Sequence, residues 1–190
     1  MIKTSVLESI HLKQKLLSDA AFVSFISGVS EAVSAAFNNG RKLLIAGNGG
    51  SFADAIHLAA EFVGRFREDR KALPAVALGA NQSVLTSVAN DYSFAGIFSR
   101  ETEAIGNEGD ILLVISTSGN SPNIVQAIHT ACEKKIKVFG LTGKTGGVMK
   151  DLCECYVVPS DNTARIQEVH IMAGHIICEL SELKVMDIRS

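Results

Sequence analysis

The chain has 190 residues, a formal net charge of −2, 47% hydrophobic residues and 20% charged residues. This length suits one domain with a full core and is short for two, and the composition is that of a soluble globular protein. Because the charge is balanced, it provides no electrostatic footprint for nucleic acid or for an anionic membrane surface. We therefore expect neither as a partner.

Residues 1–39 are expected to form two long helices. Residues 1–17 combine charged and apolar side chains at helical spacing and lack the apolar core of a signal peptide. Residues 20–37 continue this spacing as far as the helix stop at Asn38-Asn39-Gly40. No uncharged run reaches the length of a membrane span. We expect a cytosolic protein with one domain over residues 1–190, in which residues 1–39 serve oligomerisation and residues 40–183 form the sheet and its helices.

Strands and helices are expected to alternate through the rest of the chain. Short apolar runs predict strands at residues 42–46, 75–78, 111–115, 137–141 and 156–158. Helical patterns lie at residues 51–66, 84–89, 121–135, 147–152 and 164–183. This alternation predicts an α/β fold in three layers: a doubly wound, parallel, five-stranded sheet with helices on both faces.

Ligands of such sheets bind outside the carboxyl ends of the strands, near the point where the strand order reverses. We therefore expect residues 47–51, Asn90-Asp91 and residues 116–121 to lie together. Residues 116–121 read Ser-Thr-Ser-Gly-Asn-Ser, and Pro122 then begins a helix. Hydroxyl groups and the free N–H groups of a helix start can bind phosphate, although an ordinary turn with Ser121 as the N-cap has the same sequence.

The first predicted strand ends in Gly47-Asn48-Gly49-Gly50-Ser51. We expect Ser51 to cap the following helix, with Asp54 as the acid of a capping box. Glycines at this point permit the close approach of a ligand. The order G-N-G-G-S lacks the spacing of a dinucleotide fingerprint, so a small anionic or polyhydroxylated ligand fits better.

Two helices carry groups suited to acid/base chemistry or to a metal. His57 and Glu61 are four residues apart and share one helix face, which suits a metal pair, an acid/base pair or a simple surface contact. The last helix carries Gln167, His170 and His175 in an apolar stretch, where a histidine is often a packed core residue.

Two further features are expected to have structural roles only. Residues 65–71 are interpreted as a charged surface segment, because Glu68 and Asp69 interrupt its basic residues. The four cysteines are interpreted as reduced thiols, since Cys153 and Cys155 are closer together than the usual spacing of zinc ligands.

In order and spacing, these motifs resemble those of the phosphoheptose isomerases of the sugar isomerase (SIS) fold, and the likeness covers residues 40–183. The motifs are G-N-G-G-S at 47–51, His57 to Glu61, Asn90-Asp91-Tyr92, residues 116–121, and residues 165–168 with His170 and His175. The resemblance implies a cytosolic homotetramer that interconverts sedoheptulose 7-phosphate and D-glycero-D-manno-heptose 7-phosphate. This is the first step toward the ADP- or GDP-heptose precursors of lipopolysaccharide or related surface glycans.

The resemblance also implies the roles of individual residues. Glu61 and His175 match the acid/base residues of the family. One zinc ion per subunit is expected on His57, Glu61, Gln167 and His175. The phosphate is expected on Ser116, Thr117, Ser118 and Ser121. Other substrate contacts are expected from Asn48, Gly49, Gly50, Ser51, Glu61, Asn90, Asp91 and Gln167.

An aldose–ketose isomerase needs a base that moves a proton through an enediol and a group that polarises the oxygens. Glu61 is the natural base, His175 is the natural acid, and zinc would act as a Lewis acid; whether Glu61 leaves the metal during turnover stays open. Gln167 and His175 lie about 12 Å apart along a straight helix. Either that helix is irregular near Gln167 or different subunits contribute, and we favour a site at a subunit boundary.

Phe52, Asn81-Gln82 and Ala164 depart from the family pattern and bear on the preferred sugar. The main alternative is a non-catalytic tetramer of the same fold that binds the replication initiator protein, but this regulator lacks the counterparts of Glu61 and His175. An isomerase for another ketose phosphate is a further alternative. A sugar-phosphate sensor of a transcriptional regulator would need a helix-turn-helix segment, and we find no signature of one.

Overall fold

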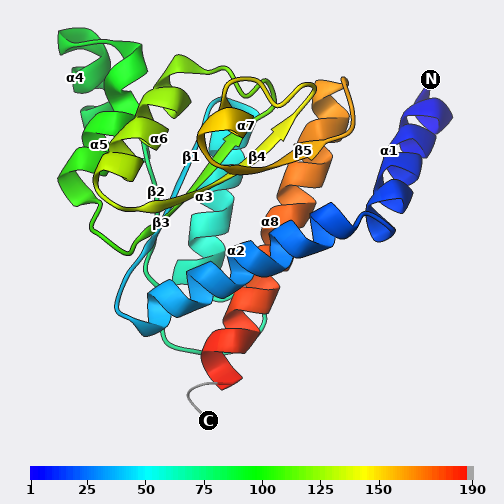
Figure 1. Cartoon of the computed structure of the whole chain (residues 1–190), viewed down its shortest axis with the longest axis horizontal. Helices are drawn as coiled ribbons and strands as arrows, with labels where there is room; N and C mark the ends of the chain where they lie inside the picture. The colour runs from blue at the N-terminus through cyan, green and yellow to red at the C-terminus, as the bar shows by residue number, and fades with distance from the viewer. Residues whose placement is uncertain (188–190) are drawn as a thin grey trace.

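Five parallel strands form the centre of the molecule (Figure 1). The computed structural model describes residues 1–187. The strands are β1 (Leu43–Gly47), β2 (Ala75–Ala77), β3 (Ile111–Ser116), β4 (Lys137–Gly143) and β5 (Glu154–Val158). Their order is β2-β1-β3-β4-β5, and Gly47 at the end of β1 is paired with Ile115 of β3. The strand order therefore reverses between β1 and β3, which is where ligands bind in such sheets.

The helices lie between the strands, largely where the apolar spacing predicts them. They are α1 (Ile2–Leu17), α2 (Ala20–Asn38), α3 (Gly50–Val63), α4 (Gln82–Asp91), α5 (Ile97–Ile105), α6 (Pro122–Glu133), α7 (Met149–Leu152) and α8 (Thr163–Asp187). The sequence prediction missed α5 and the short 3-10 helix η1 (Phe94–Gly96) that precedes it. Only three residues of α5 are buried, so its apolar pattern is too short to be recognised.

Each face of the sheet is covered by its own hydrophobic core, as the three-layer prediction requires. Alternate strand residues such as Ile45 and Leu113 pack with α2, α3 and α8, whereas Leu44 and Leu112 pack with α4, α5 and α6. All residues of β1 and β3 are buried. Burial on both faces explains why these strands are continuous apolar runs in the sequence.

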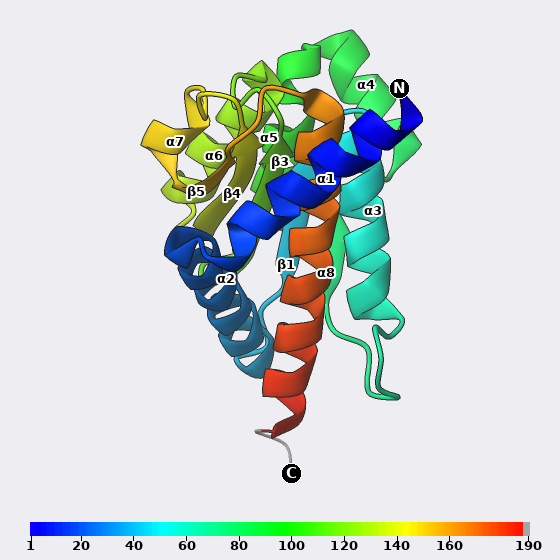
Figure 2. The same cartoon turned by 90° about the vertical axis from the view of Figure 1, so that its right-hand side faces the viewer.

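The two N-terminal helices differ in their packing. α2 buries Phe25, Val29 and Val33 in the core beside the sheet, so this helix is part of the fold of the single chain. A role of residues 1–39 in oligomerisation stays a prediction. α2 is the one described helix that is long and apolar enough to cross a membrane, but half of that stretch is buried inside the fold. α1 buries only Leu12 and Leu16 and lies across α8 at the edge of the molecule (Figure 2).

α3 and α8 lie side by side and run in the same direction (Figure 2). Their contacts follow one another down the pair, from Gly50 with Gln167 to Leu58 with Gly174. A Cβ atom on Gly174 would lie 2.5 Å from Leu58 Cδ1, so only glycine permits this close approach. The approach also brings together the neighbours of these two residues, His57 before Leu58 and His175 after Gly174.

Candidate active site

Two of the three predicted ligand segments meet at the switch in strand order. The side chains of Asn48, after β1, and Asn123, in the first turn of α6, exchange two hydrogen bonds of 2.9 and 2.8 Å. This amide pair joins the G-N-G-G-S loop to the serine-rich loop that ends at α6. The prediction that these two loops lie together is confirmed.

The start of α3 differs from the expectation. α3 begins at Gly50 with Gly49 as its N-cap, and no side chain caps it. Ser51 lies inside the helix with 3% exposure, so the predicted capping box of Ser51 and Asp54 is wrong. The reason is the left-handed φ of 56° at Gly49, which places the N-cap two residues before Ser51.

The serine-rich loop places its hydroxyl groups at the start of a 12-residue helix. Ser121 is the N-cap of α6 and Pro122 follows it, as predicted, but the Ser121 hydroxyl accepts no bond from the helix N–H groups. Its Oγ atom lies 3.3 Å from Ser116 Oγ instead. Ser118 Oγ accepts a 3.2 Å hydrogen bond from the Asn120 N–H. The loop thus combines hydroxyl groups with a helix N-terminus, which favours an anion.

Asn90 and Asp91 lie at the far end of α4. The helix extends through both residues, so they do not follow it as a loop, and they are exposed. Their side chains share a 2.8 Å hydrogen bond. A ten-residue helix is about 15 Å long, which separates this pair from the helix start beside β2. Their contact with a sugar stays a prediction.

The predicted acid/base residues converge on His57. His57 Nε2 lies 3.0 Å from Glu61 Oε1, and the rings of His57 and His175 are 5.0 Å apart in an edge-to-face arrangement. The ring of Phe66 lies 5.8 Å from that of His175. The side chains of His57 and Glu61 are 49% and 25% exposed, so the cluster is open to solvent in a single chain.

Gln167 does not lie in this cluster. It packs against Gly50, where an added Cβ atom would be 2.6 Å from Gln167 Nε2. α8 is continuous from Thr163 to Asp187, so an irregular helix does not bring Gln167 to His175 of the same chain. A contribution from another subunit, the alternative favoured from the sequence, stays a prediction.

The donor atoms of the cluster are of the kinds that bind zinc, namely two imidazoles and a carboxylate. Within residues 1–187, however, no group of three or more His, Cys, Asp or Glu side chains is arranged to hold a metal ion. His57 and Glu61 are hydrogen-bonded to each other instead. The chemistry of the donor set therefore fits zinc, and binding would require these side chains to turn.

Asp54, predicted only as the acid of a helix cap, lies on the same helix face as His57 and Glu61. Asp54 is on α3, one turn before His57, and its Oδ2 atom is buried with no hydrogen-bond partner among residues 1–187. Burial raises the pKa of Asp54, and nearby His57 and His175 oppose this rise. The sequence could have indicated this, because residues 54, 57 and 61 are spaced to share one face of a helix.

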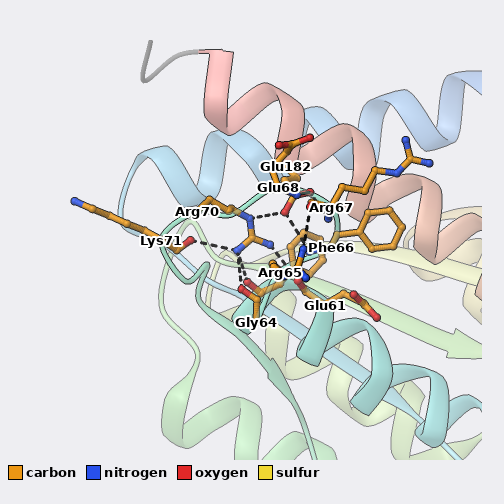
Figure 3. Close-up of polar contacts among 10 residues, drawn as sticks. Glu61, Gly64, Arg65, Phe66, Arg67, Glu68, Arg70, Lys71 and Glu182 are labelled. Carbon is orange, nitrogen blue, oxygen red and sulfur yellow. Dashed lines mark hydrogen bonds and ion pairs between the residues drawn. The ribbon is translucent and has the colours of Figure 1, made fainter.

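The segment of residues 65–71 is not simply a surface segment. Arg70 forms an ion pair of 2.7 Å with Glu182 of α8, and these side chains are only 6% and 2% exposed (Figure 3). The Arg70 guanidinium also donates to the backbone carbonyls of Glu61 and Phe62, at 3.0 and 2.8 Å. Arg70 thus binds carbonyl groups in the last turn of α3, which carries Glu61.

Glu182 holds the same loop from the other side. Its carboxylate accepts hydrogen bonds from the N–H groups of Phe66 and Arg67, at 3.2 and 2.9 Å. Burial disfavours the charged form of Glu182, which would raise its pKa. The backbone hydrogen bonds and the charge of Arg70 outweigh this effect, so the pKa of Glu182 is lowered. The Arg70–Glu182 pair therefore fixes the loop that places the Phe66 ring beside His175.

Phe52, Asn81 and Ala164, which we expected to bear on the preferred sugar, have local structural positions. The Asn81 side chain caps α4 by accepting hydrogen bonds from the N–H groups of Ser83 and Val84. Phe52 lies against Gly79, after β2, where an added Cβ atom would be 3.3 Å from its ring. Ala164 is exposed in the first turn of α8.

The cysteines are free thiols, as predicted. The sulfur atoms of Cys153 and Cys155 lie 3.5 Å apart, with both thiols directed at the Met149 carbonyl. Cys178 is buried in the core that contains α8, and Cys132 is exposed.

His170 is a core residue and not part of the cluster. It is fully buried, with Nε2 at 3.1 Å from the Thr142 carbonyl oxygen. Burial lowers the pKa of His170 to about 4, and the hydrogen bond from its ring to Thr142 opposes this shift. Of the histidines in this apolar stretch, His170 is therefore the one packed in the core.

His170 should make the protein less stable in acid. The pKa of His170 in the folded protein is about 4, below the ordinary 6.5. Its contribution to the free energy of unfolding is therefore complete above pH 6.5 and is lost as the pH falls toward 4. The loss amounts to roughly 3 kcal/mol over this range. Urea unfolding at several pH values should show a weaker pH dependence for His170→Gln, whereas exposed His129→Gln should match the wild type. If the free energy of unfolding changed equally with pH in all three proteins, His170 would not be buried in its neutral form.

Comparison with known proteins agrees with this architecture. The family model for the SIS domain matches residues 18–143 of the chain. The fold and the loops at the switch point are therefore those of a SIS-domain protein. Among the relatives, "Phosphoheptose isomerase" of Clostridium acetobutylicum is 51% identical over 182 residues, which are 95% of this chain and 93% of the relative. "Phosphoheptose isomerase 2" of Campylobacter jejuni is 46% identical over 182 residues, which are 95% of this chain and 90% of the relative.

Solved structures give the same result. A phosphoheptose isomerase from Francisella tularensis is 36% identical with a TM-score of 0.91, and the match covers 96% of both chains. The enzyme of the same name from Neisseria gonorrhoeae is 39% identical with a TM-score of 0.88, over 95% of this chain and 96% of that one. Within the SIS-domain class, the chain belongs to the phosphoheptose isomerase family.

Proposed function

We propose that this protein is an aldose–ketose isomerase that converts sedoheptulose 7-phosphate into D-glycero-D-manno-heptose 7-phosphate. The observation that carries the proposal is the convergence of Glu61 and His175 on His57. Relatives about half identical over nearly the whole chain are named phosphoheptose isomerases, which supports the substrate. The alternative of a non-catalytic regulator has no such support. The product would enter the synthesis of activated heptose for surface glycans.

The reaction needs proton transfers at carbon and at oxygen. Glu61 would take a proton from C1 of the ketose while the carbonyl oxygen at C2 receives one from His175, which gives the enediol. Return of the proton to C2 by Glu61, with removal of the proton on O1 by His175, would give the aldose. Both side chains therefore end each turnover in the protonation state in which they began it.

A zinc ion on His57, Glu61, His175 and Gln167 is part of the proposal. When bound, zinc would polarise the substrate oxygens as a Lewis acid. The support from this chain is that His57, His175 and Glu61 lie together and supply two imidazoles and a carboxylate, which are zinc-binding groups. His57 would then hold the ion and keep Glu61 beside the reacting carbons.

The phosphate of the substrate would bind at residues 116–121. Ser116, Ser118 and Ser121 supply hydroxyl groups there, and the α6 N-terminus supplies N–H groups and the positive end of the helix dipole. Asn48 would contact the sugar from the neighbouring loop, since Asn123 holds its amide at this edge of the sheet.

We infer that active sites form at the subunit boundaries of a homotetramer. In one chain, Glu61 lies eleven residues along α3 from Gly50, a distance of about 16 Å, so its own phosphate loop is remote. Ile56 and Val63 are 43% and 49% exposed on α3 beside the cluster, as expected for a contact surface. α1 exposes further apolar residues that suit a subunit contact, namely Ile2, Val6, Leu7 and Ile10.

A cytosolic location completes the proposal. Its support is the packing of α2, whose apolar side lies in the core beside the sheet and α8. The net charge of −2 gives no attraction to nucleic acid or to an anionic membrane.

Proton exchange is the sharpest test of the function. The purified protein, supplied with zinc, is incubated in deuterated water with sedoheptulose 7-phosphate, and the sugar is analysed by NMR. An enediol route places deuterium on the carbon next to the carbonyl, and the aldoheptose phosphate appears. Binding of the sugar without either label or product would refute an isomerase. Label and product from a different ketose phosphate alone would refute the heptose assignment.

The serine loop gives a separate prediction. Ser118→Ala and Ser121→Ala should each raise KM about tenfold and lower kcat much less, because a lost bond to a charged phosphate weakens ground and transition states alike. Steady-state kinetics measures this split, and Ser24→Ala on the exposed side of α2 is the control. A selective fall in kcat would contradict a phosphate-binding role.

A further inference from the structure

Two thiols lie together at the start of β5, the edge strand of the sheet. Sγ of Cys153 is 3.5 Å from Sγ of Cys155, and both residues are part-exposed. Gly140 of the neighbouring strand β4 leaves room for them, since an added Cβ atom there would lie 2.5 Å from Cys155 Sγ and 3.4 Å from Cys153 Sγ. The absence of a side chain at this position thus allows two sulfur atoms to share one place.

The backbone between the two thiols permits a disulfide. Cys153 is extended and β5 begins at the next residue, so the two side chains project from the same face. Residues two apart in extended backbone have Cα atoms about 6.4–6.8 Å apart, and disulfides span about 4.4–6.8 Å. The spacing is at the upper end of this range, and a bond formed there would be readily reduced again.

Cys155 is the thiol that reacts first with an oxidant. The hydrogen bond from the Cys153 thiol lowers the pKa of Cys155, and the same bond raises the pKa of Cys153. Because the thiolate is the nucleophile, Cys155 attacks and Cys153 stays protonated beside it. Geometry and charge therefore give the two thiols different roles, one reactive and one resolving.

A chain of hydrogen bonds joins this pair to the serine-rich loop. Both thiols are directed at the Met149 carbonyl, at 3.6 Å from Cys153 and 3.5 Å from Cys155, and the Cys153 N–H donates to it at 3.1 Å. The N–H of Met149 in turn donates to the Gly119 carbonyl at 3.0 Å. The N–H of Val148 donates to Asn120 Oδ1 at 2.9 Å. The start of α7 thus lies between the thiols and the loop.

We propose that Cys153 and Cys155 are a reversible oxidation site for hydroperoxides, and that their disulfide loosens the contact of α7 with the serine-rich loop. The effect on catalysis rests on the proposed function, because it takes residues 116–121 as the phosphate site. Oxidation removes both thiol hydrogens from the Met149 carbonyl and draws the sulfur atoms from 3.5 Å to about 2 Å apart.

The reaction balances in two steps. The Cys155 thiolate attacks the outer oxygen of the hydroperoxide, the O–O bond breaks, and the alcohol or water leaves with a proton, so that Cys155 becomes a sulfenic acid. The Cys153 sulfur then attacks the Cys155 sulfur. Hydroxide leaves and takes the Cys153 proton as water, which forms the disulfide. The peroxide gains the two electrons that the thiols lose.

Mass spectrometry of the wild type tests the site directly. Trypsin cleaves after Lys150 and Arg165, so both thiols lie in one peptide, residues 151–165, whereas Cys132 and Cys178 lie in others. After treatment with hydrogen peroxide, this peptide should lose two hydrogens and react with iodoacetamide only after reduction by dithiothreitol. The proposal is overturned if both of its thiols still react with iodoacetamide after peroxide.

Serine variants test the order of the two steps. Cys153→Ser should stop at a sulfenic acid on Cys155, which dimedone labels, and should form no lighter peptide. Cys155→Ser should give far less label on Cys153. Cys132→Ser changes an exposed thiol of α6 and is the matched control, which should form the disulfide as the wild type does. Equal labelling of Cys153 and Cys155 in the two variants would contradict the assigned order.

Amide hydrogen exchange tests the link to the serine-rich loop without substrate. In the oxidised wild type the amides of Val148 and Met149 should exchange about fivefold faster, the effect of losing one neutral hydrogen bond, and dithiothreitol should restore the slower rate. The KM for sedoheptulose 7-phosphate should rise by a similar factor with little change in kcat. Unchanged exchange in fully oxidised protein would overturn the proposed link.

These measurements separate the inference from the function on which it rests. If reduced protein does not isomerise the sugar but the disulfide forms and the two amides exchange faster, the proposed function fails and the oxidation site stands. If reduced protein is an active isomerase, and oxidised protein has the same amide exchange and the same KM, the function stands and the inference fails.

Discussion

Glu61→Gln should lower kcat for the isomerisation by a factor of about 10²–10⁴, the range that a positioned general base contributes. The amide keeps the size of the side chain and can still accept a bond from His57, but it cannot take a proton from carbon. The backbone carbonyl of Glu61, which accepts from Arg70, is unchanged. Steady-state kinetics with sedoheptulose 7-phosphate and the loss of deuterium exchange would measure the effect.

Two controls make this result specific. Glu133→Gln changes an exposed carboxylate of α6 and should leave kcat unchanged. Circular dichroism and the thermal midpoint of Glu61→Gln should match the wild type, because Glu61 is open to solvent. A Glu61→Gln protein with normal turnover would exclude Glu61 as the base, whatever its contact with His57.

Arg70→Met should lower the free energy of unfolding by about 3–5 kcal/mol, the cost of breaking a buried ion pair by removing one partner. Methionine leaves the Glu182 carboxylate in a site that is 2% exposed with no cation, and it leaves the last-turn carbonyls of α3 without their donor. Urea unfolding at a fixed protein concentration measures the change, since assembly would otherwise alter the apparent stability.

The neighbouring ion pair supplies the matched control for Arg70. Arg67 pairs with Glu179 at 2.7 Å, but its side chain is 66% exposed, so Arg67→Met should cost less than about 1 kcal/mol. Arg70→Lys should recover only part of the loss, because a single ammonium group cannot reproduce the fork of the guanidinium. Equal effects at Arg67 and Arg70 would show that the buried pair contributes no more than a surface contact.

Much of the fold could be predicted because it depends on local patterns. Apolar runs such as residues 111–115 are read as buried strands without knowledge of their neighbours, and helical spacing marks α2 and α6. The meeting of Asn48 with the serine loop also followed, since parallel strands place their carboxyl ends at one edge of a sheet.

Errors arose where a local rule met a competing local conformation. Ser51 has the sequence context of an N-cap, but the left-handed backbone at Gly49 starts α3 earlier. α5 has too few buried residues to show a periodic pattern. In both cases the chain around the residue, and not its own propensity, set the boundary of the helix.

The amino-acid sequence by itself determined the order of strands and helices, the chemistry of the loops and the identity of the groups able to move protons. Only the tertiary structure decided which of these groups meet. The pairing of α3 with α8 brings His175 to His57 but leaves Gln167 beside Gly50, and it buries Arg70 against Glu182, 112 residues away in the chain. The physical reason is that burial and ion pairing depend on side chains distant in sequence, so a charged segment such as residues 65–71 cannot reveal from its own composition which of its charges is covered.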